Sequence, residues 1–188
     1  GNTFADDRLQ TLNSAAEITD GGGSNTGYRF VSYLLKAGYS FDDKFFVNAS
    51  ARYDGSSRFG SDNIYGLFPA ISAGYDIARD IESPFSQLKV RASYGLTGNA
   101  GIGNFVSAGL VGFGNDYNAI PGFLLDQLEN TELTWETATT VDVAVDFELA
   151  NGFLNGTIGW YNKTTSDLLL AVPQPQTNGI NSLTLNAG

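Results

Sequence analysis

The stretch Lys44–Ser57, "KFFVNASARYDGSS", decides the fold because its side chains divide into two chemically different sets. Alternation with a period of two residues predicts a β-strand that has one apolar and one polar face. In a soluble protein the apolar face would point into a core. In an outer-membrane barrel it would point into lipid, and the polar face would line the lumen. The apolar set is Phe45, Val47, Ala49, Ala51 and Tyr53, and the opposite set is Phe46, Asn48, Ser50, Arg52 and Asp54.

The composition excludes several classes of function. The chain has 188 residues, 20 acidic against 10 basic side chains, and no histidine or cysteine. Because phosphate binding needs clustered basic residues, nucleic acid is not an expected partner. The lack of histidine and cysteine removes the commonest general base, the commonest metal ligand and the thiolate nucleophile. We therefore expect no catalytic residues, no metal site and no cofactor, and the protein is not expected to be an enzyme.

Five further segments alternate in the same way, and none shows a competing helical period. They are longer than the about five or six residues typical of soluble strands, and they approach the length that crosses a bilayer. Aromatic residues lie near the segment ends on the apolar face, as in interfacial girdles. The segments are 28–41, 66–78, 87–98, 139–150 and 153–170, and "LTLNAG" at 183–188 is expected to begin a further strand.

Turn chemistry predicts antiparallel hairpins with a defined register. Asn151-Gly152 is a strong two-residue hairpin signal, and Asp42–Lys44 fits a three-residue loop because both flanking strands keep odd apolar positions. The short connections alternate with long ones along the chain, which is typical of outer-membrane barrels. The predicted pairs are Phe41 with Phe45, Tyr39 with Val47, Tyr33 with Tyr53, Leu149 with Leu154, and Val145 with Ile158.

Charged residues on two of the segments predict ion pairs across the polar face. Lys89 and Arg91 lie on segment 87–98, and Asp146 and Glu148 lie near the same end of the expected neighbour. We predict that Arg91 pairs with Asp146 and Lys89 with Glu148, each contributing about 0.2–1 kcal/mol.

Four motifs in order resemble the barrel of SusC-like TonB-dependent transporters. They are "RYDGSSRFG" (52–60), "GLFPAISAGYDI" (66–77), "LKVRASYGLTGN" (88–99) and "LTWETATTVDVAVDFELANGFLNGTIGWYNKTTSDLL" (133–169). The closing "PQP", "NG" and "NAG" of residues 173–188 are similar to the stretch that follows in that family. The resemblance covers most of residues 28–188.

The resemblance implies an all-β fold of antiparallel up-and-down strands in a large plugged barrel of the bacterial outer membrane. It implies import of glycans or related oligomers such as peptides, a SusD-like surface lipoprotein as a lid, and energy supplied by TonB through a plug domain. Residues 1–27 are expected to form an extracellular loop, and 28–188 a partial barrel of about six strands plus the start of a seventh. The chain matches neither plug nor signal peptide, so it is interpreted as an internal barrel fragment.

The connection 99–132 is the best candidate for ligand contact, because long structured loops are often functional. Phe113 and Tyr117 offer flat apolar faces, and Asp116 and Asn118 offer planar polar groups for sugar hydroxyls. Loop packing or contact with the lid is the alternative role for these residues. Arg58, in the turn "DGSSRFG", is free to bridge loops.

Two other classes of protein remain open at this point. A soluble β-sandwich that binds glycans, or an adhesin, would alternate equally well along its strands. A glycosidase is less favoured, because Asp142 and Asp146 would lie about 13 Å apart along one strand, too far for paired acid–base hydrolysis.

Overall fold

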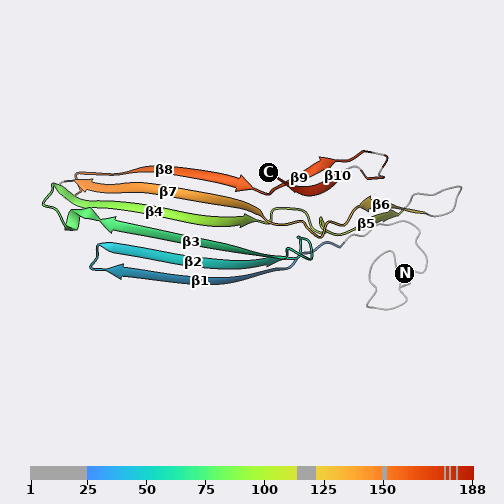
Figure 1. Ribbon diagram of the computed structural model, residues 1–188, viewed down its shortest axis with the longest axis horizontal. Coiled ribbons are helices and arrows are strands. Elements are labelled where there is room, and N and C mark those ends of the chain that lie inside the picture. Colours follow the sequence, from blue (N-terminus) through green and yellow to red (C-terminus); the bar gives the residue numbers. More distant parts are fainter. Residues whose placement is uncertain (1–24, 114–121, 150–151, 176, 178, 181) are drawn as a thin grey trace, which may run out of the picture.

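The computed structural model describes residues 25–113, 122–149, 152–175, 177, 179–180 and 182–188. These residues form one long antiparallel sheet and two small hairpins (Figure 1). The sheet order is β1–β2–β3–β4–β7–β8, so the predicted antiparallel up-and-down arrangement is confirmed. No helix in the described ranges is long and apolar enough to span a membrane. The strands are β1 Phe30–Phe41, β2 Phe45–Ser56, β3 Tyr65–Asp76, β4 Phe85–Asn99, β7 Glu136–Leu149 and β8 Leu154–Ser166.

The two predicted hairpin registers are confirmed. Between β1 and β2, the three-residue turn places Asp42 and Asp43 in the left-handed region, with φ of 53° and 50°, which short polar side chains tolerate. Between β7 and β8, Gly152 has a φ of 96°, which suits glycine. The observed pairs include Phe41 with Phe45, Tyr39 with Val47, Tyr33 with Tyr53, Leu149 with Leu154, and Val145 with Ile158.

The sheet has a turn end and a loop end (Figure 1). At the turn end, β1 joins β2 by a tight turn, and the 3-10 helix η2 (Ile77–Arg79) leads from β3 toward β4. Lys44 in the turn donates a hydrogen bond to Asp80, which raises the pKa of Lys44, and Tyr75 donates to the same carboxylate. The connections after β2, β4 and β8 all leave from the loop end.

Two hairpins lie at the loop end, and of their strands the sequence pattern indicated the one that begins at "LTLNAG", residues 183–188, where a strand does lie. β5 (Leu110–Phe113) pairs with β6 (Phe123–Gln127), and β9 (Leu168–Pro173) pairs with β10 (Ser182–Ala187). The expected strand 153–170 is split at Asp167, whose φ of 55° ends β8 and redirects the chain into β9. The stretch 183–188 therefore pairs with β9, and in the described residues it does not extend the six-stranded sheet.

The two faces of the sheet differ in charge. The strand registers and side-chain alternation place all charged side chains of the six strands on one face, which we call the polar face. The opposite, apolar face carries exposed residues such as Leu35 (73%) and Ile158 (71%), and no second sheet covers it within the described ranges. A sandwich would bury these residues. The charged residues are Lys36, Arg52, Asp54, Asp76, Lys89, Arg91, Glu136, Asp142, Asp146, Glu148 and Lys163.

The division into faces predicts a pattern of chemical accessibility. Single cysteines along β2 of the complete receptor in outer membranes should react with a lipid-soluble probe at positions 47, 49 and 51. They should react with a water-soluble maleimide at positions 48, 50 and 52, because successive side chains point to opposite faces. Protection of the odd positions from both probes would indicate a soluble core and contradict the assignment.

Candidate functional site

The ladder between β3 and β4 stops before the loop end. Its last pair is Ala70 with Gly95, whereas β3 continues to Tyr65 beside β2 alone. The residue next to the last pair is Pro69, which has no backbone N–H to donate. The ring of Phe68 then lies over Gly98, where a Cβ atom would be only 2.0 Å from the ring. Glycine at this position therefore lets an aromatic side chain fill the place where the two strands part.

An aromatic cluster closes this part of the polar face. Phe59, Phe68, Leu133 and Trp135 are all buried, and Leu133 is completely so. The ring centroid of Trp135 lies 4.6 Å from that of Phe59 and 5.4 Å from that of Phe68. The Trp135 indole N–H donates to the carbonyl of Ile64 at 3.2 Å, so this aromatic ring also satisfies its polar atom. The cluster joins β3 to the turn after β2 and to the segment before β7.

The turn "DGSSRFG" (54–60) is anchored at both ends. Asp54 is 1% exposed, and its carboxylate accepts hydrogen bonds of 2.6 Å from both Ser32 and Arg52. A buried carboxylate is tolerable because it is paired in this way. At the other end, Gly60 donates its backbone N–H to Leu133 at 3.0 Å. Phe59 points into the aromatic cluster.

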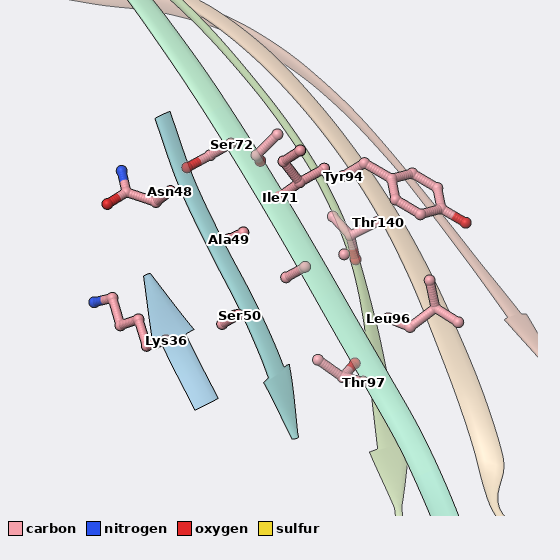
Figure 2. A pocket seen from close by; sticks show the side chains of 13 residues that line it. Lys36, Asn48, Ala49, Ser50, Ile71, Ser72, Tyr94, Leu96, Thr97 and Thr140 are labelled. Carbon is pink, nitrogen blue, oxygen red and sulfur yellow. The ribbon is translucent and has the colours of Figure 1, made fainter. Parts of the chain in front are cut away.

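The middle of the polar face contains a shallow hollow of about 460 Å³. Figure 2 shows Lys36 and Asn48 extending from one side of the strands, and Tyr94 and Leu96 from the other. The polar-face lining consists of hydroxyl, amide, ammonium and small side chains and includes no carboxylate. Such a surface can hydrogen-bond a polar solute or a packed protein segment, but it offers no acid–base pair. The polar members are Lys36, Asn48, Ser50, Ser72, Ser93, Thr97 and Thr140.

Arg91 lies between two carboxylates of β7. It stands opposite Ala144 in the register, so it reaches Asp146 on one side at 3.0 Å and Asp142 on the other at 3.2 Å. Thr157 of β8 donates to the second oxygen of Asp146 at 2.7 Å. The structure thus brings Arg91 and Asp146 together as a diagonal pair and links β4, β7 and β8 across the polar face.

Lys89 is not placed against Glu148, and this part of the predicted pairing is corrected. Lys89 stands opposite Asp146, and Glu148 stands opposite Gln87, because the register differs by two residues from the predicted one. The Lys89 ammonium instead lies 4.0 Å from the centre of the Phe46 ring, a cation–π contact. Its side chain crosses Gly74, where a Cβ atom would lie 3.0 Å from Lys89 Cε.

Of the four candidate ligand residues, the described part of the chain includes only Phe113. Phe113 is the last residue of β5, whereas Asp116, Tyr117 and Asn118 lie outside the described residues, so their role stays a prediction. The base of the β5–β6 hairpin is fixed by Gln127, which sequence reasoning missed. Its side-chain amide donates to the carbonyls of Phe105, Val106 and Ala108 at 2.6–2.9 Å. In the sequence Gln127 stands between Asp126 and Leu128, and nothing in this pattern marks it as a residue that binds carbonyls.

The second hairpin is fixed by asparagine side chains that the sequence analysis also missed. The amide of Asn186 in β10 accepts from the N–H of Thr134 and donates to its carbonyl, both at 2.9 Å, as a neighbouring strand would. Asn130 donates to the carbonyl of Thr184 at 3.0 Å. These contacts hold β10 against the segment that leads into β7.

A family model described as "TonB dependent receptor-like, beta-barrel" matches residues 1–188. The chain belongs to the TonB-dependent receptor β-barrel family. It is 39% identical to TonB-dependent receptor P39 of Formosa agariphila over 98% of this chain and 18% of that protein. It is 33% identical to TonB-dependent receptor SusC of Bacteroides thetaiotaomicron over 84% and 17%. The chain superposes on a solved structure of the RagAB peptide transporter with a TM-score of 0.78, at 30% identity, over 96% of this chain and 21% of that one.

Membership in this family shows which face of the sheet meets lipid and which face lines the lumen. The predicted SusC-like resemblance, the membrane-barrel fold and the outer-membrane location are confirmed. The apolar face is therefore the lipid-facing wall, and the polar face lines the lumen. The chain spans about a fifth of the length of these relatives, and its six strands do not close a barrel. Among the described residues, no group of three or more acidic side chains is placed to hold a metal ion.

The contact between Gly60 and Thr131 gives a test of the loop-end packing. A Cβ atom at Gly60 would lie 1.9 Å from the Thr131 carbonyl oxygen, so Gly60→Ala must displace backbone. We expect a loss of about 1–3 kcal/mol in the free energy of unfolding, measured by urea titration of the complete receptor in lipid vesicles. Gly27→Ala is the control, because no atom lies within 4 Å of the added group, and should change it by less than about 0.5 kcal/mol. Equal losses would contradict the packing.

The ion pairs of Arg91 with Asp142 and Asp146 give a test of the observed register between β4 and β7. The side chains of Arg91, Asp142 and Asp146 are 44%, 33% and 28% exposed, so solvent weakens each pair to about 1 kcal/mol or less. A double-mutant cycle of Arg91→Gln with Asp146→Asn should give a coupling of about 0.5–1 kcal/mol that falls with salt. The matched cycle of Lys89→Gln with Glu148→Gln should give a coupling near zero. A larger coupling for Lys89 with Glu148 than for Arg91 with Asp146 would contradict the observed register and favour the one predicted from the sequence.

Proposed function

We propose that this chain forms part of the barrel wall and of the external mouth of an outer-membrane importer of oligomeric nutrients. The observation that carries the proposal is that all charged side chains of the six-stranded sheet lie on one face, opposite a face that carries none. Such a sheet separates lipid from an aqueous passage, and membership in the TonB-dependent receptor family supports import through it. Selective passage needs no bond-breaking residues, in line with a transporter and not an enzyme.

The proposed partners follow from the two ends of the sheet. Residues 1–27 form an extracellular loop, and 28–188 form part of the barrel, so the loop end faces outward and receives a SusD-like lipoprotein lid. TonB acts at the turn end through a plug domain. The likeness to SusC and to one chain of the RagAB peptide transporter supports this arrangement.

Two classes of nutrient fit the lumen wall, glycans and peptides. Hydroxyl and amide side chains in the hollow, such as Asn48, Ser72 and Thr140, can exchange hydrogen bonds with sugar hydroxyls or with peptide groups. We propose Phe113, Asp116, Tyr117 and Asn118 as ligand contacts at the mouth, with aromatic faces for sugar rings or apolar side chains.

Uptake by intact cells tests the proposed function. Deleting the receptor gene should abolish uptake of one of two fluorescent probe pools, labelled oligosaccharides or labelled oligopeptides, and a plasmid-borne copy should restore it. A protonophore should stop the same uptake, because the energy is expected to come from the inner-membrane proton gradient. Uptake of both pools that survives deletion unchanged would contradict the proposal, and the pool that is lost identifies the substrate class.

A further inference from the structure

Arg58 lies where three segments of the loop end meet. These are the segment 25–29 that leads into β1, the turn 57–60 that follows β2, and the segment 100–106 that follows β4. We propose that Arg58 is a positioning residue that couples segments 25–29 and 100–106, so that each holds its place at the mouth only while the other does. The uptake consequence of this inference rests on the proposed function, but the coupling itself does not.

The guanidinium of Arg58 holds segment 100–106 by two bonds in different directions. Nε donates to the side-chain oxygen of Asn104 at 2.9 Å, and a terminal nitrogen donates to the carbonyl of Ala100 at 3.0 Å. A planar guanidinium that donates along two edges is fixed in orientation as well as in position. Lysine could not fix this orientation, because its three donors rotate freely at the end of a flexible stem.

The same guanidinium holds segment 25–29 by its face. It lies 3.8 Å from the centre of the Tyr28 ring, a close cation–π contact. Asn104, which accepts from Arg58, also donates to the Thr26 hydroxyl at 2.7 Å. The side chains of Tyr28, Arg58, Asn104 and Thr26 therefore form a series of three contacts whose two ends lie on the same segment, 25–29, so loss of one member loosens the others.

The turn that carries Arg58 is itself held in place by neighbouring residues. Phe59, next to Arg58, is buried in the aromatic cluster, so the turn carries one side chain inward and its neighbour toward the loops. The backbone of Arg29 also binds the turn, since its N–H donates to the Ser57 hydroxyl at 2.9 Å and its carbonyl accepts from the Ser57 N–H at 3.0 Å. The side chain of Arg29 takes part in none of these bonds.

Hydrogen exchange of the complete receptor in lipid nanodiscs tests the coupling. Arg58→Gln should raise amide exchange by about tenfold in both segments, because it removes the charge-assisted hydrogen bonds to segment 100–106 and the cation–π contact with segment 25–29, and should leave the strands unchanged. Arg29→Gln is the matched control, because it removes one positive charge from segment 25–29 without removing any of these contacts. Amide exchange in this variant is expected to stay at the wild-type rates. Arg58→Lys should protect segment 25–29 better than segment 100–106, because it keeps a charge near Tyr28. Wild-type rates in Arg58→Gln, or equal effects of the two Gln variants, would overturn the proposal.

A second variant addresses coupling without altering Arg58. Tyr28→Leu removes only the cation–π contact between Tyr28 and Arg58. It should nevertheless raise amide exchange in segment 100–106 as well, since the orientation of Arg58 then changes. An effect confined to segment 25–29 would mean two independent contacts and overturn the coupling.

In the probe uptake assay, Arg58→Gln should raise the concentration for half-maximal uptake while the maximal rate is retained. If wild-type cells take up neither probe, the proposed function is refuted. The coupling still stands in that case, provided that the hydrogen-exchange rates of the variants change as expected.

Discussion

The exclusion of charge from one face of the sheet is the constraint on which the rest of this structure depends. A charged side chain facing the hydrocarbon costs several kcal/mol near the bilayer midplane, on the order of 2–4 for Arg or Lys in a barrel. A slip of one residue between neighbouring strands would turn a whole strand over and expose its charges to lipid. Registers such as Tyr33 opposite Tyr53 are therefore specified by the entire alternating pattern and not by a single favourable pair.

The same constraint explains how much of the fold could be predicted from the sequence. Where a connection is short, its length and the alternation together leave one register, so the β1–β2 and β7–β8 hairpins were predicted residue by residue. Between β4 and β7 the connection is long, and alternation fixes the face but allows shifts by two residues. Lys89 was consequently predicted on the correct face but opposite Glu148, whereas it stands opposite Asp146 and its ammonium lies over Phe46.

The loop end was less predictable because its organisation depends on side chains that replace backbone partners. The amide of Asn186 bonds both backbone groups of Thr134 as a strand would, and the amide of Gln127 donates to three carbonyls. Neither residue differs in the sequence from other exposed polar residues around it. Arg58 was an exception, because a long cation directly after a tight turn has few local partners. Its role as a bridge between loops was expected, although the ring contact with Tyr28 was not. Sequence pattern thus describes regular strands well and describes contacts among loops only where one residue is chemically unusual.

Glycine gives the lumen wall a surface across which large side chains can lie flat. The ladder of β3 and β4 ends beside Pro69, and the two strands part there. Phe68 fills this place only because Gly98 has no Cβ, and Lys89 reaches Phe46 only because its path crosses Gly74. At both positions a glycine thus makes room for a large side chain that lies against the backbone of a neighbouring strand. A wall built in this way can carry aromatic and charged side chains close to its backbone, because glycine leaves the space that a Cβ atom would otherwise occupy.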